Sequence, residues 1–178
     1  AILILTFAWT LKAMTDSLGA APFVASVMNS AAGGLMNLLP AIIFLVGCFL
    51  AFATGTSWGT FGILIPIVVA VFQGTNETMM IISISACMAG AVCGDHCSPI
   101  SDTTVLSSAG SGCVHIEHVY TQLTYSLTVA VSALIGYAIA GVTRSLPLSL
   151  GAAVIVMVLL IIFMHKRQLK LAKAQTAA

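Results

Sequence analysis

Residues 94–104 read G-D-H-C-S-P-I-S-D-T-T and place two aspartates, a histidine, a proline and four hydroxyl side chains within eleven residues. The fifteen residues before them are almost all apolar or small. Gly94 loosens a helix, and Pro99 lacks a backbone N–H and disfavours helix at Ser98. We therefore expect an apolar helix that runs into this stretch to break around residues 94–99.

The surrounding chain has the composition of an integral membrane protein. Its 178 residues are 60% hydrophobic and 6% charged, and the mean hydropathy is +1.12, whereas a soluble domain carries about 25% charged residues. No charged residue or histidine occurs from Ser17 to Asn76, and residues 119–143 and 145–164 form two further uncharged runs. Each of these two runs has the length of about 20 residues that a membrane-spanning helix needs. We therefore expect an all-α integral membrane protein.

The pattern along the chain predicts a single transmembrane domain over residues 1–178. Two apolar arms, each too short to span a bilayer, flank A-T-G-T-S-W-G-T at residues 53–60. They predict either a re-entrant helical hairpin or one broken spanning helix over 40–73, and the spacing leaves both open. The other expected elements are a helix at 1–28, a discontinuous helix at 79–110, transmembrane helices at 119–142 and 146–165, and a basic tail at 166–178.

Two features of the chain ends predict its context. The segment H-K-R-Q-L-K-L-A-K holds four of the six basic residues, so by the positive-inside rule we expect a cytoplasmic C-terminus and a multi-pass protein. The chain begins inside a hydrophobic run without an initiator Met or the pattern of a signal peptide. We interpret it as a fragment that lacks its N-terminal part.

Asp95 is the strongest candidate for a functional residue. A carboxylate inside a bilayer costs about 3 kcal/mol or more, so an intramembrane acid is a functional candidate by default. A helix break exposes backbone carbonyls that suit cations, and the hydroxyls of Ser98 and Ser101 add further oxygens. Burial favours the protonated carboxyl and a bound cation favours the carboxylate, so a proton and a cation would compete for Asp95. An internal salt bridge is the alternative.

Asp102 is the second candidate for the exchanging carboxylate. It lies near the start of the second half-helix, where it can instead act as the helix N-cap. Thr103 and Thr104 follow it and offer two more hydroxyl oxygens. The sequence leaves both roles open.

The stretch at 53–60 offers a second group of hydroxyls, which includes Thr54, Thr56 and Ser57. Hard cations such as sodium prefer oxygen ligands of this kind. G-T-S-W-G also matches the G-x-S-x-G nucleophile elbow, which needs a strand before the serine and a helix after it. An intramembrane serine protease, with His96 as base, is therefore kept as a remote alternative, but we do not expect an enzyme.

Other polar residues support weaker hypotheses. A proton relay and a packing role are both open for His96, because histidine titrates near neutral pH. Glu117 lies in an expected cytoplasmic loop over 110–118, where it is either solvated or takes part in proton uptake. C-G-D-H-C at 93–97 does not have the separated pairs of ligands that a zinc site uses, so we expect no transition metal and no cofactor. A basic surface for nucleic acid is also missing from the sequence.

The string G-D-H-C-S-P-I-S-D-T-T-V-L-S-S-A-G (94–110), followed by H-I-E-H-V-Y-T-Q-L-T-Y (115–125), resembles the signature of NhaC-type sodium/proton antiporters. F-A-T-G-T-S-W-G-T-F-G-I-L-I-P (52–66) and A-W-T-L-K-A-M-T-D-S-L-G (8–19) are similar to other segments of that family. The resemblance covers about residues 5–142.

The resemblance implies a fold of two inverted repeats, each with a re-entrant hairpin followed by a discontinuous helix, whose tips meet near the middle of the membrane. This chain would be one inverted-repeat half, and its partner would be the missing N-terminal repeat of the same protein. The implied function is Na+/H+ antiport by alternating access in a prokaryotic plasma membrane. Exchange of an organic anion or amino acid coupled to the same ions is the alternative.

The expected site and partners follow from these hypotheses. The ion- and proton-binding residues are Asp95, Asp102, Ser98, Ser101, Thr103, Thr104, Thr54, Thr56 and Ser57, with His96 and Glu117 as proton relays. The partners are the lipid bilayer, Na+ and H+ as transported ions, and the missing repeat, with a homodimer left open. Small residues at 86, 89, 90 and 94 predict close packing of the helix that carries them.

Overall fold

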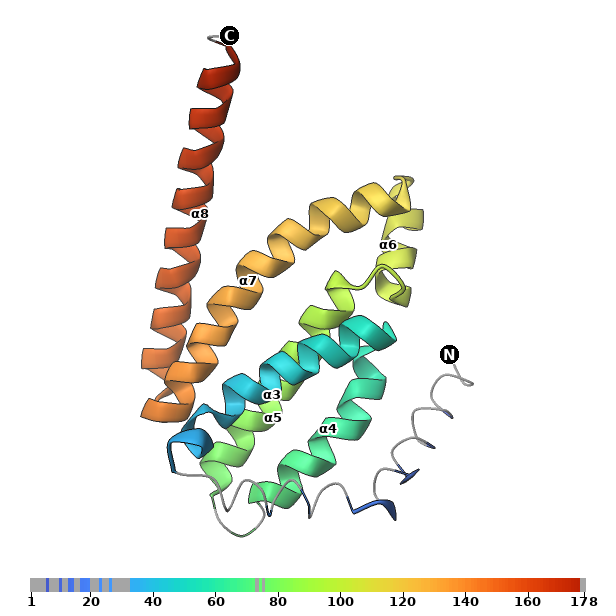
Figure 1. Ribbon diagram of the computed structural model, residues 1–178, viewed down its shortest axis with the longest axis vertical. Helices are drawn as coiled ribbons and strands as arrows, with labels where there is room; N and C mark the ends of the chain where they lie inside the picture. The colour runs from blue at the N-terminus through green and yellow to red at the C-terminus, as the bar shows by residue number, and fades with distance from the viewer. Residues whose placement is uncertain are drawn as a thin grey trace.

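The computed structural model describes residues 33–72, 74 and 76–176, together with scattered positions between 6 and 26. Over the described residues the regular structure is helical throughout (Figure 1). The helices are α3 (Gly33–Thr54), α4 (Ser57–Phe72), α5 (Glu77–Cys97), α6 (Asp102–Ser111), α7 (His115–Thr143) and α8 (Leu146–Thr176). Apart from the scattered positions, the helix expected at 1–28 lies outside the described residues.

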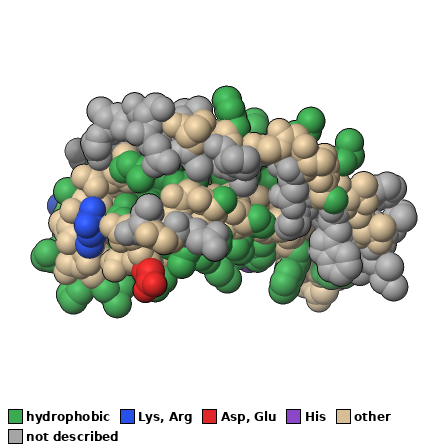
Figure 2. Space-filling view, turned by 90° about the horizontal axis from the view of Figure 1, so that it is seen from below, with side chains coloured by type: hydrophobic (Ala, Val, Ile, Leu, Met, Phe, Trp, Pro, Cys, Tyr) green, Lys and Arg blue, Asp and Glu red, His purple; other side chains and the backbone are tan. Residues whose placement is uncertain are grey.

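Four of these helices are long and apolar enough to cross a membrane. Their candidate spans are Met36–Thr54, Glu77–Cys97, His115–Thr143 and Leu146–Leu169. The apolar helix α4 is shorter, with 16 residues. Seen from the end that holds the α7–α8 turn, charged side chains are sparse on the surface (Figure 2). The composition and these spans confirm an all-α, multi-pass membrane protein.

Helices α3 and α5 pack side by side (Figure 1), and their backbones approach closely at two glycines of α5. A Cβ added at Gly90 would collide with the backbone carbonyl of Phe44, and one added at Gly94 would collide with that of Cys48. These contacts confirm the close packing that the small residues predict, because only glycine leaves room for the opposing backbone.

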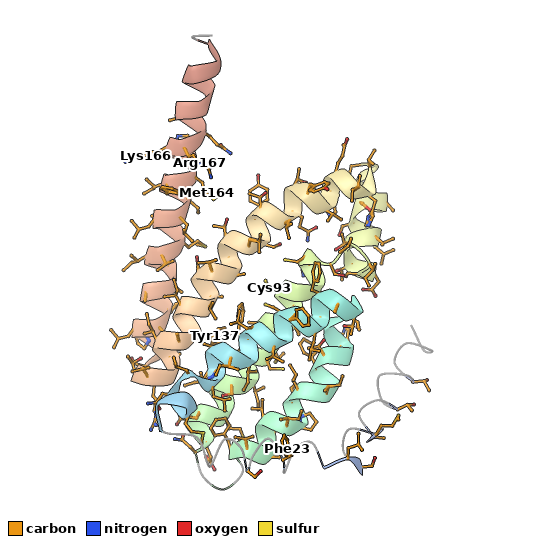
Figure 3. The ribbon with its side chains drawn as sticks, in the orientation of Figure 1. Phe23, Cys93, Tyr137, Met164, Lys166 and Arg167 are labelled. Carbon is orange, nitrogen blue, oxygen red and sulfur yellow. The ribbon has the colours of Figure 1, made fainter. Side chains whose placement is uncertain are left out.

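Tyr137 of α7 contacts both α3 and α5. Its ring lies with a centroid distance of 5.6 Å from the ring of Phe44 on α3. Its hydroxyl donates to the backbone carbonyl of Ser85 on α5 at 3.2 Å and lies 3.0 Å from the Ser85 hydroxyl. Figure 3 shows Tyr137 between α7 and the α3–α5 pair. The three helices therefore form one packed unit.

Helices α3 and α4 fold back on each other at Gly55, so that α4 returns toward the end of the molecule where α3 begins (Figure 1). Gly55 has a φ of 68°, a left-handed conformation that favours glycine. The first helix starts at Gly33 and contains Pro40, whereas the sequence placed the start at Pro40 itself. Proline is tolerated inside membrane helices. Re-entry of this hairpin at one membrane surface stays a prediction.

The discontinuity after α5 lies at residues 98–101, later than the expected 94–99. Gly94 stays helical because its missing side chain accommodates α3 rather than loosening the turn. Ser98 adopts an extended conformation, with φ −77° and ψ 127°, as expected for a residue before proline. Asp95 therefore lies in the last turn of α5 instead of in the break.

The last two helices extend beyond the predicted spans. Helix α7 begins at His115, inside the loop expected at 110–118, and α8 continues to Thr176, through most of the expected tail. The two are joined at Arg144, which has a left-handed φ of 53°. The cytoplasmic orientation of the C-terminus stays a prediction.

Candidate functional site

Asp95 is a buried carboxylate whose side chain meets hydroxyls and no basic group among the described residues. It is 2% exposed, whereas Glu77, Asp102 and Glu117 are exposed. Ser101 Oγ donates to Asp95 Oδ1 at 2.8 Å, and Thr103 Oγ1 donates to Asp95 Oδ2 at 3.0 Å. The internal salt bridge considered from the sequence therefore has no partner in the part of the chain that the structure describes. An ionised carboxylate buried in this way needs a compensating positive charge.

Ser101 and Thr103 also contact each other, which closes a triangle of three side chains. Their hydroxyl oxygens lie 2.7 Å apart. When Asp95 is ionised, both hydroxyls donate to it. When Asp95 is protonated, its O–H can donate to Thr103, Thr103 to Ser101, and Ser101 to the other carboxyl oxygen. The triangle therefore accommodates both protonation states without leaving a donor unpaired.

Two further buried hydroxyls, one in the break and one in the first turn of α6, have no hydrogen-bond partner among the described residues. Ser98 is 0% exposed and Thr104 is 2% exposed, and neither side-chain oxygen is satisfied. Ser98 lies three residues after Asp95, and its backbone N–H donates to the Asp95 carbonyl at 3.1 Å. Because buried polar atoms are normally satisfied, two unpaired oxygens in the segment that follows the buried Asp95 are candidates for contacts with a ligand that accepts electron pairs. A desolvated cation is such a ligand.

The tip of the α3–α4 hairpin packs against the helix break. A Cβ added at Gly55 would lie 2.9 Å from Ile100 Cγ1 and 3.0 Å from the Ile100 carbonyl oxygen. This contact brings together the two polar stretches that the sequence singled out, at 53–60 and 94–104. Ile100 supplies the contact, although the sequence analysis gave it no role.

The hydroxyls of the hairpin tip serve mainly their own helices. Thr54 is exposed and donates to the Leu50 carbonyl at 2.7 Å. Thr56 Oγ1 accepts the N–H of Gly59 at 3.4 Å, at the start of α4, and Ser57 is half-buried. Within the described residues no hydrogen bond joins these three side chains to Asp95, and their role as ion ligands stays a prediction.

We expect Gly55→Ala to destabilise the protein and to disturb the break. An alanine in the left-handed region costs about 1–2 kcal/mol, and its Cβ would press on Ile100. The measurement is thermal unfolding of the full-length protein in detergent. Gly62→Ala in α4 is the matched control, since its Cβ would meet nothing within 4 Å. Equal unfolding temperatures for the two variants would contradict the tip contact.

Asp102 does not act as the helix cap that the sequence suggested. Ser101 is the N-cap of α6, and its Oγ accepts the N–H of Thr103 at 3.2 Å. Asp102 is the first residue of the helix, exposed, where a negative charge interacts favourably with the helix dipole. Of the two roles left open for Asp102, the cap is therefore excluded, because the adjacent Ser101 has the extended backbone of a cap and occupies that position.

The serine-protease geometry is not found among the described residues. Ser57 begins α4 directly after the helical α3, whereas a nucleophile elbow follows a strand. His96 is exposed, and its Nδ1 bonds to the Val92 carbonyl at 2.8 Å instead of to Ser57. In the described part of the chain, no cluster of three or more His, Cys, Asp or Glu side chains lies close enough to hold a metal ion. Glu117 is exposed in the first turn of α7, and relay roles for it and for His96 stay predictions.

His115 is a contact residue that sequence spacing missed. Its imidazole bonds to the Pro99 carbonyl and to the Ser108 hydroxyl, which places it beside the break. The available signal was its place at the start of the 115–125 block, but no local rule connects it with a residue sixteen positions earlier.

Comparisons with known proteins point to one family. A family model described as "Na+/H+ antiporter family" matches residues 1–142. The chain is 47% identical, over 94% of its length, to an uncharacterized protein of Haemophilus influenzae, of which it covers 32%. It is 33% identical, over 61% of its length, to the malate-2H(+)/Na(+)-lactate antiporter of Bacillus subtilis, of which it covers 24%.

A third relative is an uncharacterized Na(+)/H(+) antiporter of Haemophilus influenzae, to which the chain is 34% identical over 48% of its length. The chain covers 19% of that protein. It thus spans about a third or less of the length of these curated relatives. No solved structure matches the chain.

Proposed function

The chain belongs to the Na+/H+ antiporter family, a premise from which we propose that it carries part of the ion site of a transporter exchanging Na+ for H+. The observation that carries this proposal is the burial of Asp95 between two donating hydroxyls, with no basic partner among the described residues. Such a carboxylate is stable when it binds either a proton or a cation. Mutually exclusive binding of the two is the requirement for coupled exchange.

The alternation between ions follows from the surroundings of Asp95. A sodium ion beside the ionised carboxylate would use the free oxygens of Ser98 and Thr104, which have no partner in the described residues. The C-terminal end of α5 adds the negative end of a helix dipole, which favours a cation. When sodium leaves, a proton neutralises Asp95, and the Thr103 hydroxyl turns to accept from Asp95 and to donate to Ser101, which continues to donate to the other carboxyl oxygen.

The architecture of the family supplies the rest of the proposal. The α3–α4 hairpin is re-entrant, its tip and the α5–α6 break are two parts of the ion site, and this chain is one of two inverted repeats. The contact of Gly55 with Ile100 supports this arrangement. In this proposal the second repeat of the same protein completes the site. The location is a prokaryotic plasma membrane with the C-terminus in the cytoplasm.

Exchange of an organic solute with the same ions is the second candidate function. It is favoured by the similarity to a relative named as a malate-2H(+)/Na(+)-lactate antiporter. An amino acid as the solute is the other form of this alternative. Both forms keep Asp95 as the coupling carboxylate and differ in what travels with the ions.

We expect sodium alone to drive proton release. The experiment adds NaCl to everted vesicles that carry the full-length protein and follows the dequenching of a pH-sensitive dye, with and without malate or lactate. Equal dequenching in both conditions supports Na+/H+ exchange, since no third solute is then required. Dequenching only after an organic anion is added would establish the second candidate. Choline chloride is the control for a non-specific salt effect.

A further inference from the structure

The imidazole of His115 joins three segments that meet at the helix break. His115 is the first residue of α7, and its Nε2 lies 2.7 Å from the backbone oxygen of Pro99, in the loop between α5 and α6. Its Nδ1 lies 3.0 Å from the hydroxyl oxygen of Ser108, on α6. Ser108 is 3% exposed, so the second contact is anchored inside the protein. One side chain therefore connects the loop, α6 and α7.

The loop that His115 holds has little support from its own backbone. Pro99 has no N–H to donate. The loop's internal bonds are from the N–H of Ser98 to the Asp95 carbonyl at 3.1 Å and from the N–H of Ser101 to the Ser98 carbonyl at 3.4 Å. The contact between His115 and Pro99 is shorter than both. It fixes the peptide between two serines that both belong to the proposed ion site.

The neutral and the charged imidazole of His115 can both make these two hydrogen bonds. A carbonyl oxygen only accepts, so Nε2 carries the hydrogen donated to Pro99. In the neutral ring, Nδ1 accepts from the Ser108 hydroxyl. In the charged ring, Nδ1 donates to Ser108, whose own hydrogen then goes to the Val105 carbonyl, 2.9 Å away. Both states satisfy Pro99 and Ser108.

We propose that His115 is a positioning residue for the ion site: by holding the Pro99 carbonyl against α6, it keeps Ser98 and Ser101 aligned with Asp95. This role rests on the proposed ion exchange at Asp95. It differs from a proton relay, because the Pro99 carbonyl has no hydrogen to pass on. It also differs from a general packing role, because its effect is confined to the loop and to the affinity for the ion.

The test uses the full-length protein with His115→Ala, and His118→Ala as the matched control. His118 lies one turn further along α7, and its Nε2 is buried with no hydrogen-bond partner in the part of the chain that the structure describes. Amide hydrogen exchange over residues 98–105 should be faster in His115→Ala than in the wild type and unchanged in His118→Ala. The apparent KM for sodium should rise about tenfold in His115→Ala, the size expected for the loss of one hydrogen bond to a site group, with a smaller change in maximal rate.

Each outcome of this test decides the proposal. The proposal would be overturned if His115→Ala left amide hydrogen exchange over 98–105 unchanged. It would also be overturned if amide exchange became faster while the KM for sodium stayed the same. If the wild type shows no sodium-driven proton flux, the proposed function fails, while the amide exchange still tells whether His115 positions the loop. If His115→Ala does not fold, Ser108→Ala is tested instead, because it removes one of the two contacts of His115. It should speed amide hydrogen exchange over 98–105 and raise the KM for sodium about threefold. His115→Gln keeps a donor for Pro99 and should restore part of the affinity.

Discussion

Asp95→Asn should reduce sodium-driven proton flux to the level of vesicles that contain no antiporter. Asparagine has nearly the same shape as aspartate, so the fold should survive. Its amide carries no negative charge to bind sodium and takes up no proton at physiological pH. One of its groups is also an N–H donor, which would face a hydroxyl that donates to the carboxylate in the wild type. Both halves of the exchange cycle would be lost together.

Asp102→Asn separates a site effect from a general effect of removing negative charge near the break. The Asp102 side chain is exposed and forms no hydrogen bond with Asp95, Ser101 or Thr103 in the described part of the chain, so we expect this variant to keep most of its sodium/proton exchange. The measurement is dye dequenching in everted vesicles, normalised to the amount of folded protein. If Asp95→Asn exchanged sodium for protons at the wild-type rate, Asp95 would not be the exchanging carboxylate. Loss of exchange in Asp102→Asn alone would transfer the role to Asp102.

The sequence predicted the membrane class and the presence of the helix break, because both depend on local chemistry. Runs of apolar residues with few charges specify spanning helices, and the spans of α5, α7 and α8 overlap the expected ones. Pro99 specifies a break through its own backbone, wherever the neighbouring helices lie. The predicted position of the break was less accurate because a glycine such as Gly94 can either loosen a helix or allow another backbone to pack closely. In the structure Gly94 remains helical and packs against the backbone of α3.

The details of the candidate site depend on contacts that spacing does not encode. Ser101 serves as helix cap and as donor to Asp95 at once, whereas the sequence predicted only an ion-binding role for Ser101 and left the cap open for Asp102. The bond between His115 and Pro99 spans the whole of α6. Its formation depends on how α7 returns after the Gly112 turn, which is a property of the packed chain. Sequence spacing therefore predicted candidate residues for the site but not their hydrogen bonds.

The direction of the α3–α4 hairpin illustrates the same limit. Two short apolar arms around a flexible stretch suit both a straight broken helix and a hairpin, since each arm buries the same residues in either case. The fold-back is fixed by the left-handed Gly55 and by its contact with Ile100, which lies 45 positions further along the chain. A single sequence offers no signal for a contact of this kind.

Gly90→Ala should destabilise the protein strongly. The added Cβ would collide with the carbonyl carbon, oxygen and Cα of Phe44, all of which are backbone atoms that no rotamer change can move. Overpacking of a core costs about 1–3 kcal/mol and sometimes more, and a collision between two backbones belongs at the upper end. Relief requires α3 and α5 to separate, which would also displace the hairpin tip from the helix break.

Gly151→Ala in α8 provides the matched control, because the same methyl group added there meets nothing within 4 Å. We expect this variant to unfold at the wild-type temperature or slightly above it, since alanine favours helix more than glycine does. Gly90→Ala should unfold at a clearly lower temperature or fail to accumulate as folded protein. The measurement is thermal unfolding of the full-length protein in detergent, together with its yield from membranes. If the two variants had the same unfolding temperature and the same yield, α3 and α5 could not be in backbone contact at Gly90. The packing of α5, which carries Asp95, against α3 would then differ from the one described.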